Sequence, residues 1–235
     1  MNTFRSIGLF GGSFDPVHNG HVLVARAALE ELSLDRLFII PAARSPFKPE
    51  QQSAPAAARL RLLRLAFADF EDCQIDTQEI KRDGISYSID TIRTYAGRHP
   101  EAKLHYLIGA DHVPTLPQWR ESTDLAKLAK FVVVPRPGPA VAPFPEPFRG
   151  QALRGWPIEV SSSAIRERLA LGQAIGDLPR IARPGDDRLP AALGGPVEGR
   201  LDLQPRVGVD DQRFLAAYPW QHRVPGRHAF MPGSR

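Results

Sequence analysis

Short apolar runs alternate with helix-forming segments along most of this chain, and this alternation limits the possible folds more than any other feature. Most runs end at glycine or proline, as is typical of strands buried on both faces of a parallel sheet. The segments between them are those expected of helices that cover such a sheet. We therefore expect an α/β fold with a doubly wound parallel sheet and helices on both faces. The expected strands span residues 6–10, 36–40, 74–77, 104–108, 131–134 and 158–160, and the expected helices 19–32, 56–68, 88–98, 125–129 and 162–171.

The C-terminal part of the chain departs from this pattern. Residues 179–235 contain eight prolines, seven glycines and no lysine, and they lack a long periodic segment. We expect one domain over residues 1–178 and an Arg/Pro/Gly-rich extension over 179–235 that is poorly ordered or atypical. The sequence leaves open whether this extension is a lineage-specific addition or translation in a shifted frame. Within the domain, six prolines in residues 135–147 predict a loop.

Charge and composition exclude several classes of function. The net charge is +4, but nine arginines against six acidic residues in the extension account for most of it. A nearly neutral body without an aromatic RNA-binding pattern argues against a nucleic-acid partner. No apolar run approaches the roughly 20 residues that cross a bilayer, so no membrane partner is expected. The single cysteine, Cys73, excludes an internal disulfide and favours a reducing, cytoplasmic location.

The first expected strand leads into a glycine loop with the sequence Gly11-Gly12-Ser13-Phe14-Asp15-Pro16-Val17-His18-Asn19-Gly20-His21. Paired glycines let backbone N–H groups approach a ligand, and the following helix directs its N-terminal N–H groups to the same place. This arrangement predicts a cradle for a polyphosphate, although the Gly-Lys-Ser/Thr ending of a Walker loop is missing. His18 and His21 project from one face, where two imidazoles can stabilise charge on a phosphorus under attack.

Two further motifs follow later strands. Val160-Ser161-Ser162-Ser163-Ala164-Ile165-Arg166 places hydroxyls at a helix N-terminus and Arg166 one turn further along, a combination suited to phosphate oxygens. In Ile108-Gly109-Ala110-Asp111, Gly109 allows adenine or ribose to approach closely, and Asp111 can accept from ribose hydroxyls. Ligands of a Rossmann-like sheet bind at the carboxyl ends of its strands, and these motifs fall there.

Each motif also has an interpretation without a nucleotide. His18, His21 and Asp15 form either a structural turn or a metal site, although zinc usually needs a further ligand and a second shell. The serines are then a helix N-cap beside a solvated Arg166, and Asp111 is a turn residue. The convergence of the motifs on one edge of the expected sheet favours the functional interpretation.

The glycine loop resembles the signature of the nucleotidylyltransferase superfamily with the H-x-G-H motif, and most specifically that of bacterial nicotinate-nucleotide adenylyltransferases. Residues 160–166 resemble the I-S-S-T-x-I-R segment of that family, and the resemblance covers residues about 5–178. It implies an enzyme of NAD biosynthesis that transfers an adenylyl group from ATP to nicotinate mononucleotide. The implied products are deamido-NAD and pyrophosphate, formed by in-line attack without a covalent intermediate, with Mg²⁺ bound to the ATP.

The resemblance also implies the residues of the site. The implied catalytic residues are His18, His21 and Arg166. The implied ATP contacts are Gly11, Gly12, Ser13, Phe14, His18, His21, Gly109, Asp111, Ser161, Ser162, Ser163 and Arg166. The implied mononucleotide contacts are Arg44, Lys48, Ser86, Tyr87, Ser88, Trp119 and Arg120, with Trp119 stacked on the nicotinate ring and the amides of Ser88 and Arg120 on its carboxylate. No residue is expected to bind a metal directly.

Two positions depart from the family's usual pattern. Ser88 stands where threonine is commoner, and Phe47 stands where a histidine is typical. Trp119 also has a simpler interpretation as a core aromatic residue. Two alternatives to the main hypothesis are a preference for nicotinamide mononucleotide and a non-catalytic nucleotide sensor, and the sequence leaves open whether the chain forms a homo-oligomer. The complete set of Ser13, His18, His21 and Arg166 favours an enzyme over a sensor.

Overall fold

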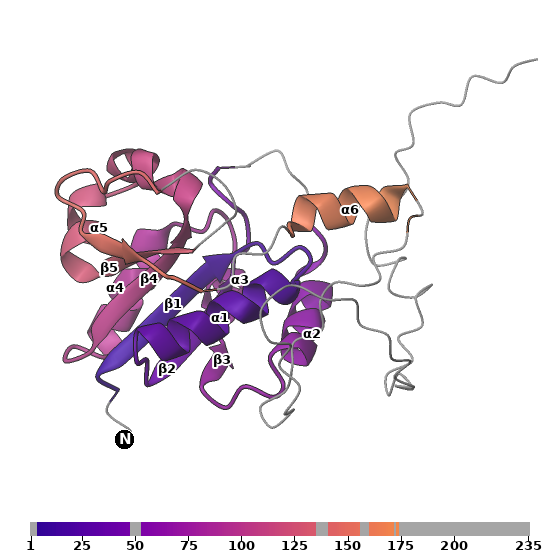
Figure 1. Cartoon of the computed structure of the whole chain (residues 1–235), viewed down its shortest axis with the longest axis horizontal. Helices are drawn as coiled ribbons and strands as arrows, with labels where there is room; N and C mark the ends of the chain where they lie inside the picture. The colour runs from indigo at the N-terminus through magenta and orange to yellow at the C-terminus, as the bar shows by residue number, and fades with distance from the viewer. Residues whose placement is uncertain (1–3, 48–52, 135–140, 156–159, 172, 174–235) are drawn as a thin grey trace, which may run out of the picture. The chain divides into compact units, whose positions relative to one another are not determined.

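The computed structural model describes residues 4–47, 53–134, 141–155, 160–171 and 173, all within the compact unit Met1–Pro179 (Figure 1). The elements along the chain are β1 (Ser6–Gly12), α1 (Asn19–Glu31), β2 (Arg36–Pro41), α2 (Ala56–Ala66), β3 (Cys73–Ile75), α3 (Gln78–Arg82), α4 (Ser88–Arg98), β4 (Lys103–Gly109), the 3-10 helix η1 (Ala110–Gln118), α5 (Ser122–Leu128), β5 (Lys130–Val134), β6 (Gly150–Ala152) and α6 (Ser162–Ala170).

The described strands form a six-stranded sheet in the order β3-β2-β1-β4-β5-β6, and each neighbouring pair is parallel. The chain builds outward from β1 to β3, returns to the centre and builds outward again from β4 to β6. This is the doubly wound, Rossmann-like order, so the predicted fold class is confirmed. The order reverses between β1 and β4, which pair directly from Ser6 opposite Lys103 to Phe10 opposite Leu107.

Some elements differ from those expected. The third strand is Cys73–Ile75 rather than 74–77. The short helices α3 and η1 were not expected, because α3 has only five residues and η1 contains Pro114 and Pro117. Strand β6 is also additional, because its exposed Gly-Gln-Ala sequence carries no apolar signal.

Parts of the sequence prediction fall on residues that are not described. Residues 158 and 159 of the expected last strand lie outside the described residues, as do 135–140 of the proline-rich loop and the whole extension 179–235. Residues 141–147 contain neither helix nor strand, as predicted for the rest of that loop. The proposed division at residue 178 therefore stays a prediction.

The sheet is covered by helices on both faces. Along β1, Ile7 and Leu9 point into the main hydrophobic core, while Phe10 points to the opposite face and contacts His21 of α1. Figure 1 shows α1 running along the front of the sheet. The alternation of side chains along a strand requires helices on both faces, and the sequence supplies them.

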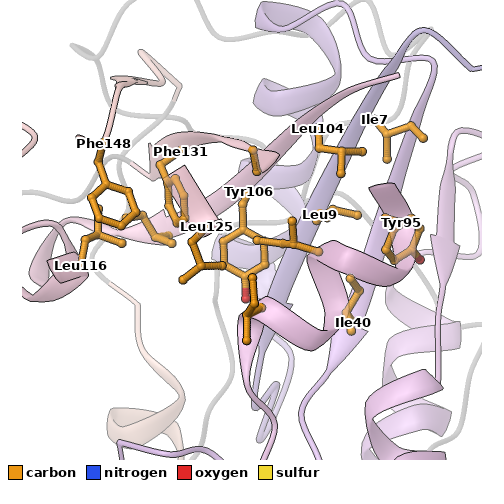
Figure 2. Close-up of a cluster of buried hydrophobic side chains, with 14 of the residues drawn as sticks. Ile7, Leu9, Ile40, Tyr95, Leu104, Tyr106, Leu116, Leu125, Phe131 and Phe148 are labelled. Carbon is orange, nitrogen blue, oxygen red and sulfur yellow. The ribbon is translucent and has the colours of Figure 1, made fainter. Parts of the chain in front are cut away.

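The main core lies between the sheet and the layer formed by α4, η1 and α5 (Figure 2). Tyr106 of β4 and Phe131 of β5 form its centre, with Phe148 packed edge-on against Phe131 at a centroid distance of 5.1 Å. The hydroxyl of Tyr95 reaches out of this core and donates to Asp76 Oδ2 over 2.6 Å. This packing fixes the carboxyl ends of β1 and β4 side by side. In the part of the chain that is described, no helix is both long and apolar enough to cross a membrane.

Candidate active site

The glycine loop begins where β1 reaches the carboxyl edge of the sheet. A Cβ added to Gly11 would lie 2.9 Å from the hydroxyl oxygen of Tyr106, so glycine is required for this close approach. Ser13 is exposed, whereas Phe14 is buried and adopts a left-handed backbone with φ of 46°. The Phe14 ring packs between Phe10 and His21, at centroid distances of 5.4 and 4.9 Å. The loop therefore turns sharply at Phe14 and is anchored there in the interior.

His18 and His21 lie together at the start of α1. His18 is the extended N-cap residue, and the two rings lie 3.8 Å apart between centroids with a 31° tilt. The backbone N–H of His18 donates to Nδ1 of His21 over 3.1 Å. Because Nδ1 accepts, a neutral His21 ring carries its proton on Nε2, which makes Nε2–H a hydrogen-bond donor. The spacing of the two histidines thus brings their rings together, as predicted.

A glycine holds His18 in this position. A Cβ added to Gly20 would lie 2.9 Å from Nδ1 of His18, closer than real Cβ contacts allow. The middle glycine of the H-x-G-H motif therefore has a packing reason: any larger residue would displace the first histidine.

Helix α6 contacts the glycine loop, although the two are far apart in the sequence. Arg166 Nη1 donates to the carbonyl of Asp15 over 2.5 Å, and Ser162 Oγ donates to the carbonyl of Pro16 over 2.9 Å. Arg166 also donates to Ser163 Oγ, and Ser161 caps the helix by accepting from the Ala164 N–H. The structure therefore brings the second motif to the first, which confirms that they are spatial neighbours, while their predicted phosphate contacts stay predictions.

The third motif lies beside the glycine loop at the point where the strand order reverses. Continuing the pairing of Phe10 with Leu107 places Gly109 level with Gly12. Asp111 follows in the first turn of η1, and its exposed carboxylate lies 3.9 Å from Nε2 of His112. Asp111 is thus accessible to a ligand on the predicted edge.

The expected mononucleotide segments are held to each other. Ser86 is buried, its Oγ accepts from the Ala43 N–H over 3.0 Å, and its own N–H donates to the Arg44 carbonyl over 2.9 Å. Ser88 begins α4, and its Oγ lies 2.8 Å from the Tyr106 hydroxyl. Tyr106 therefore touches the Ser88 side chain and lies against Gly11, linking the two expected subsites.

The buried carboxyl group of Glu79 lies next to this region. Glu79 of α3 accepts from the Thr91 hydroxyl over 2.5 Å. Burial raises the pKa of the Glu79 carboxyl above its usual range, against the lowering effects of hydrogen bonds from Thr91 and Ser86. Burial likewise raises the pKa of the Tyr106 hydroxyl, so this group stays protonated.

Trp119 lies in a group of aromatic side chains. It is half-buried, and its Nε1 donates to Thr115 Oγ1 over 3.3 Å. Phe47 is half exposed and packs on Trp119 at a centroid distance of 5.4 Å and on His112 at 4.9 Å. Arg120 extends over the Tyr87 ring at 4.7 Å. Lys48 lies outside the described residues.

A cavity of the described structure lies away from these motifs. A space of about 650 Å³ opens at the amino ends of the strands, and Phe4, Arg5, Ser6, Lys103, His105 and Lys130 are among its lining residues. The motifs lie at the opposite edge of the sheet, where ligands of this fold bind, so we place the candidate site there. Among the described residues, no group of three or more His, Cys, Asp or Glu side chains is arranged to hold a metal ion.

Comparison with known proteins identifies the family of the chain. A family model described as cytidylyltransferase-like matches residues 9–168. A probable nicotinate-nucleotide adenylyltransferase of Geobacillus kaustophilus is 37% identical over 217 residues, which cover 92% of this chain and 97% of that protein. Another, of Exiguobacterium sibiricum, is 42% identical over 169 residues, covering 72% and 88%. The chain belongs to the nicotinate-nucleotide adenylyltransferase family.

Solved structures of this family share the fold. The nicotinic acid mononucleotide adenylyltransferase of Plasmodium falciparum, complexed with NaAD, matches with a TM-score of 0.57 and 17% identity, covering 74% of this chain and 88% of that one. At this identity the likeness concerns the fold.

The Geobacillus kaustophilus relative, whose match covers 92% of this chain, aligns beyond residue 178.

One charged residue beside the candidate site, Arg59, was not predicted from the sequence. Arg59 of α2 is only 2% exposed and donates to three backbone carbonyls, one of them that of Ser13 in the glycine loop. A signal was available, because Arg59 lies four residues before Leu63 and therefore on the buried face of the helix.

Replacing Gly20 tests the packing of the histidine pair. We expect a crystal structure of Gly20→Ala to show the His18 ring displaced from its 3.8 Å stack with His21, because the new Cβ leaves it no room. The matched control is Gly97→Ala in α4, where a Cβ meets nothing within 4 Å. Gly97→Ala should stabilise the protein by about 0.5–1 kcal/mol in urea unfolding. An unmoved His18 ring in Gly20→Ala would contradict this account of the glycine.

Proposed function

We propose that this chain transfers an adenylyl group from ATP to nicotinate mononucleotide, giving deamido-NAD and pyrophosphate. The observation that carries the proposal is the junction of the two histidines, the glycine loop and Arg166 at the carboxyl edge of β1. Relatives at 36–42% identity are named for this activity. The chain is therefore an enzyme with nucleotide substrates, and the roles of its residues are proposals.

The ATP subsite is proposed on the β1–β4 side. The backbone of residues 11–14 and the N-terminus of α1 hold the triphosphate, with Ser161, Ser162, Ser163 and Arg166 of the second motif. Gly109 and Asp111 hold the adenosine part at the adjacent strand end. Mg²⁺ enters as part of the Mg–ATP substrate, with the phosphates and water as its main ligands.

The mononucleotide subsite is proposed between residues 43–48, 86–88 and the Trp119 region. Arg44 and Lys48 provide positive charge for the phosphate, and the backbone N–H groups of Ser88 and Arg120 bind the nicotinate carboxylate. Trp119 stacks on the electron-poor pyridine ring, through dispersion and cation–π attraction. The contact of Phe47 with Trp119 supports an aromatic lining for this subsite in place of the family's usual histidine.

The chemistry requires positioning more than acid–base catalysis. A phosphate oxygen of the mononucleotide attacks the α-phosphorus of ATP, a new O–P bond forms, and the bond to pyrophosphate breaks on the opposite side. The attacking phosphate is already an anion, so no general base is needed. The protein aligns two anions and stabilises the charge that develops on the α-phosphoryl oxygens. The Nε2–H of His21, fixed by the contact at Nδ1, is the proposed donor for that charge.

The partners beyond these nucleotides stay predictions. The near-neutral charge of residues 1–178 favours a protein without a nucleic-acid partner. The single cysteine favours a cytoplasmic location.

Substrate preference tests the function and the mononucleotide subsite together. Pyrophosphate release with ATP should be fast for nicotinate mononucleotide, and kcat/KM for the amide should be lower by about 10- to 100-fold, since one buried donor then faces another donor. Trp119→Ala should raise the KM for the mononucleotide far more than the KM for ATP. Equal kcat/KM values would remove the acid preference, whereas no pyrophosphate release with either substrate would contradict adenylyl transfer itself.

Removal of the second histidine tests the catalytic role. His21→Ala should lower the single-turnover rate by about 10²–10³ with little change in ATP affinity by calorimetry, because a donor that tightens in the transition state contributes mainly there. His18→Ala should lower both the rate and the affinity. His99→Ala is the matched control, since His99 lies at the C-cap of α4, just before β4 begins at the opposite edge, and its rate should be unchanged. A near-normal rate in His21→Ala would refute the catalytic assignment.

A further inference from the structure

Arg59 is a buried cation that the proposed reaction does not yet use. It lies on α2 with only 2% of its surface exposed. Its Nε donates to the Ala54 carbonyl over 3.1 Å, and its Nη1 donates to the carbonyls of Ser13 and Ala42 over 2.7 and 2.9 Å. A guanidinium is costly to bury unless its donors are satisfied, and these carbonyls accept from three of its five N–H donors.

The three carbonyls belong to three different segments of the site edge. Ser13 lies in the glycine loop after β1, Ala42 follows β2, and Ala54 immediately precedes Pro55, the N-cap of α2. Ala54 is tied to the glycine loop a second time, because its N–H donates to Asp15 Oδ2 over 3.2 Å. One side chain therefore fixes the glycine loop against the start of the segment that carries Arg44.

The bond to Ser13 determines the direction of the next amide. The described X-Pro bonds at Asp15-Pro16 and Glu146-Pro147 are the cis bonds of this part of the chain, so the Ser13–Phe14 peptide is trans. In a planar trans peptide the C=O and N–H bonds point in opposite directions. Because the Ser13 carbonyl faces Arg59, this peptide directs the Phe14 N–H away from Arg59.

The backbone at Phe14 needs such support. Its φ of 46° is uncommon for a residue with a side chain and costs free energy that its surroundings must offset. The buried Phe14 ring and the Arg59 bond hold the residue from two sides.

We propose that Arg59 is a positioning residue for ATP, which orients the Ser13–Phe14 peptide so that the Phe14 N–H meets the triphosphate. This inference rests on the proposed function, because it assumes that the glycine loop binds ATP. Arg59 also places a fixed positive charge behind the loop without contacting the substrate. Lysine does not replace it, since an ammonium group lacks the planar fork that reaches separate carbonyls.

The test compares the binding of the two substrates in Arg59→Lys. The affinity for an ATP analogue with a methylene group between the α- and β-phosphorus should fall by about 10-fold or more, as expected on losing an oriented hydrogen bond to a charged group. The affinity for nicotinate mononucleotide should fall much less, because Arg59 touches that subsite only through the Ala42 carbonyl, whose segment is also held by the hydrogen bonds between Ala43, Arg44 and Ser86. Calorimetry below the melting temperature measures both in the folded protein.

The matched control is Leu63→Ala on the same helix, where the side chain is fully buried but has no donor for a loop carbonyl. It should lower the melting temperature while leaving both affinities unchanged. If Arg59→Lys behaves as Leu63→Ala does, or weakens both substrates equally, Arg59 is only structural and the proposal is overturned.

A second measurement needs no variant. In wild-type protein labelled with ¹⁵N-phenylalanine, the Phe14 amide signal should shift on adding the ATP analogue and stay in place on adding nicotinate mononucleotide alone. An unmoved Phe14 signal at saturating analogue would overturn the proposal. Turnover of the wild type is scored separately, so an active enzyme with an unmoved signal refutes the role of Arg59 and leaves adenylyl transfer intact.

Discussion

The direct pairing of β1 with β4 is the constraint on which the site depends. The two strands are consecutive in the sheet but far apart in the sequence, and the loops that leave them diverge because the strand order reverses between them. Close packing through Tyr106 holds them in register: its ring lies in the core, and its hydroxyl lies against Gly11 and Ser88. A larger residue at Gly11 would disturb this contact, and with it the position of the glycine loop.

The proposed reaction brings two anions together, and a few positively charged groups of the protein offset their repulsion. The net charge of residues 1–178 is close to zero, so the net charge of this part of the chain does little to attract the substrates. Positive potential comes from local sources: the N-terminus of α1, Arg166 on the loop carbonyl of Asp15, and the buried Arg59 behind the loop. Buried or oriented charges are less screened by salt than exposed ones, which suits a site that must distinguish the α-phosphate from the rest of the nucleotide.

The sequence predicted those features that depend on local patterns. Apolar runs between helices predicted the sheet, and the spacing of His18 and His21 predicted that their rings lie together. The family resemblance was also confirmed. What the sequence did not predict depends on tertiary contacts: the spacing of Arg59 and Leu63 places both on one helix face, but nothing local shows that the Arg59 guanidinium reaches the carbonyls of Ser13 and Ala42. Likewise, the contact of Phe47 with Trp119 joins loops after β2 and β4 and has no local signature.

The stereochemistry of transfer at the α-phosphorus tests the central claim most directly. The account holds that the mononucleotide phosphate displaces pyrophosphate in one in-line step, with the histidine pair and the glycine loop holding a single geometry. ATP made chiral at the α-phosphorus by sulfur substitution, reacted with nicotinate mononucleotide, should give a dinucleotide with inverted configuration at that phosphorus. Retention would reveal two displacements through a covalent adenylyl-enzyme and would contradict the account.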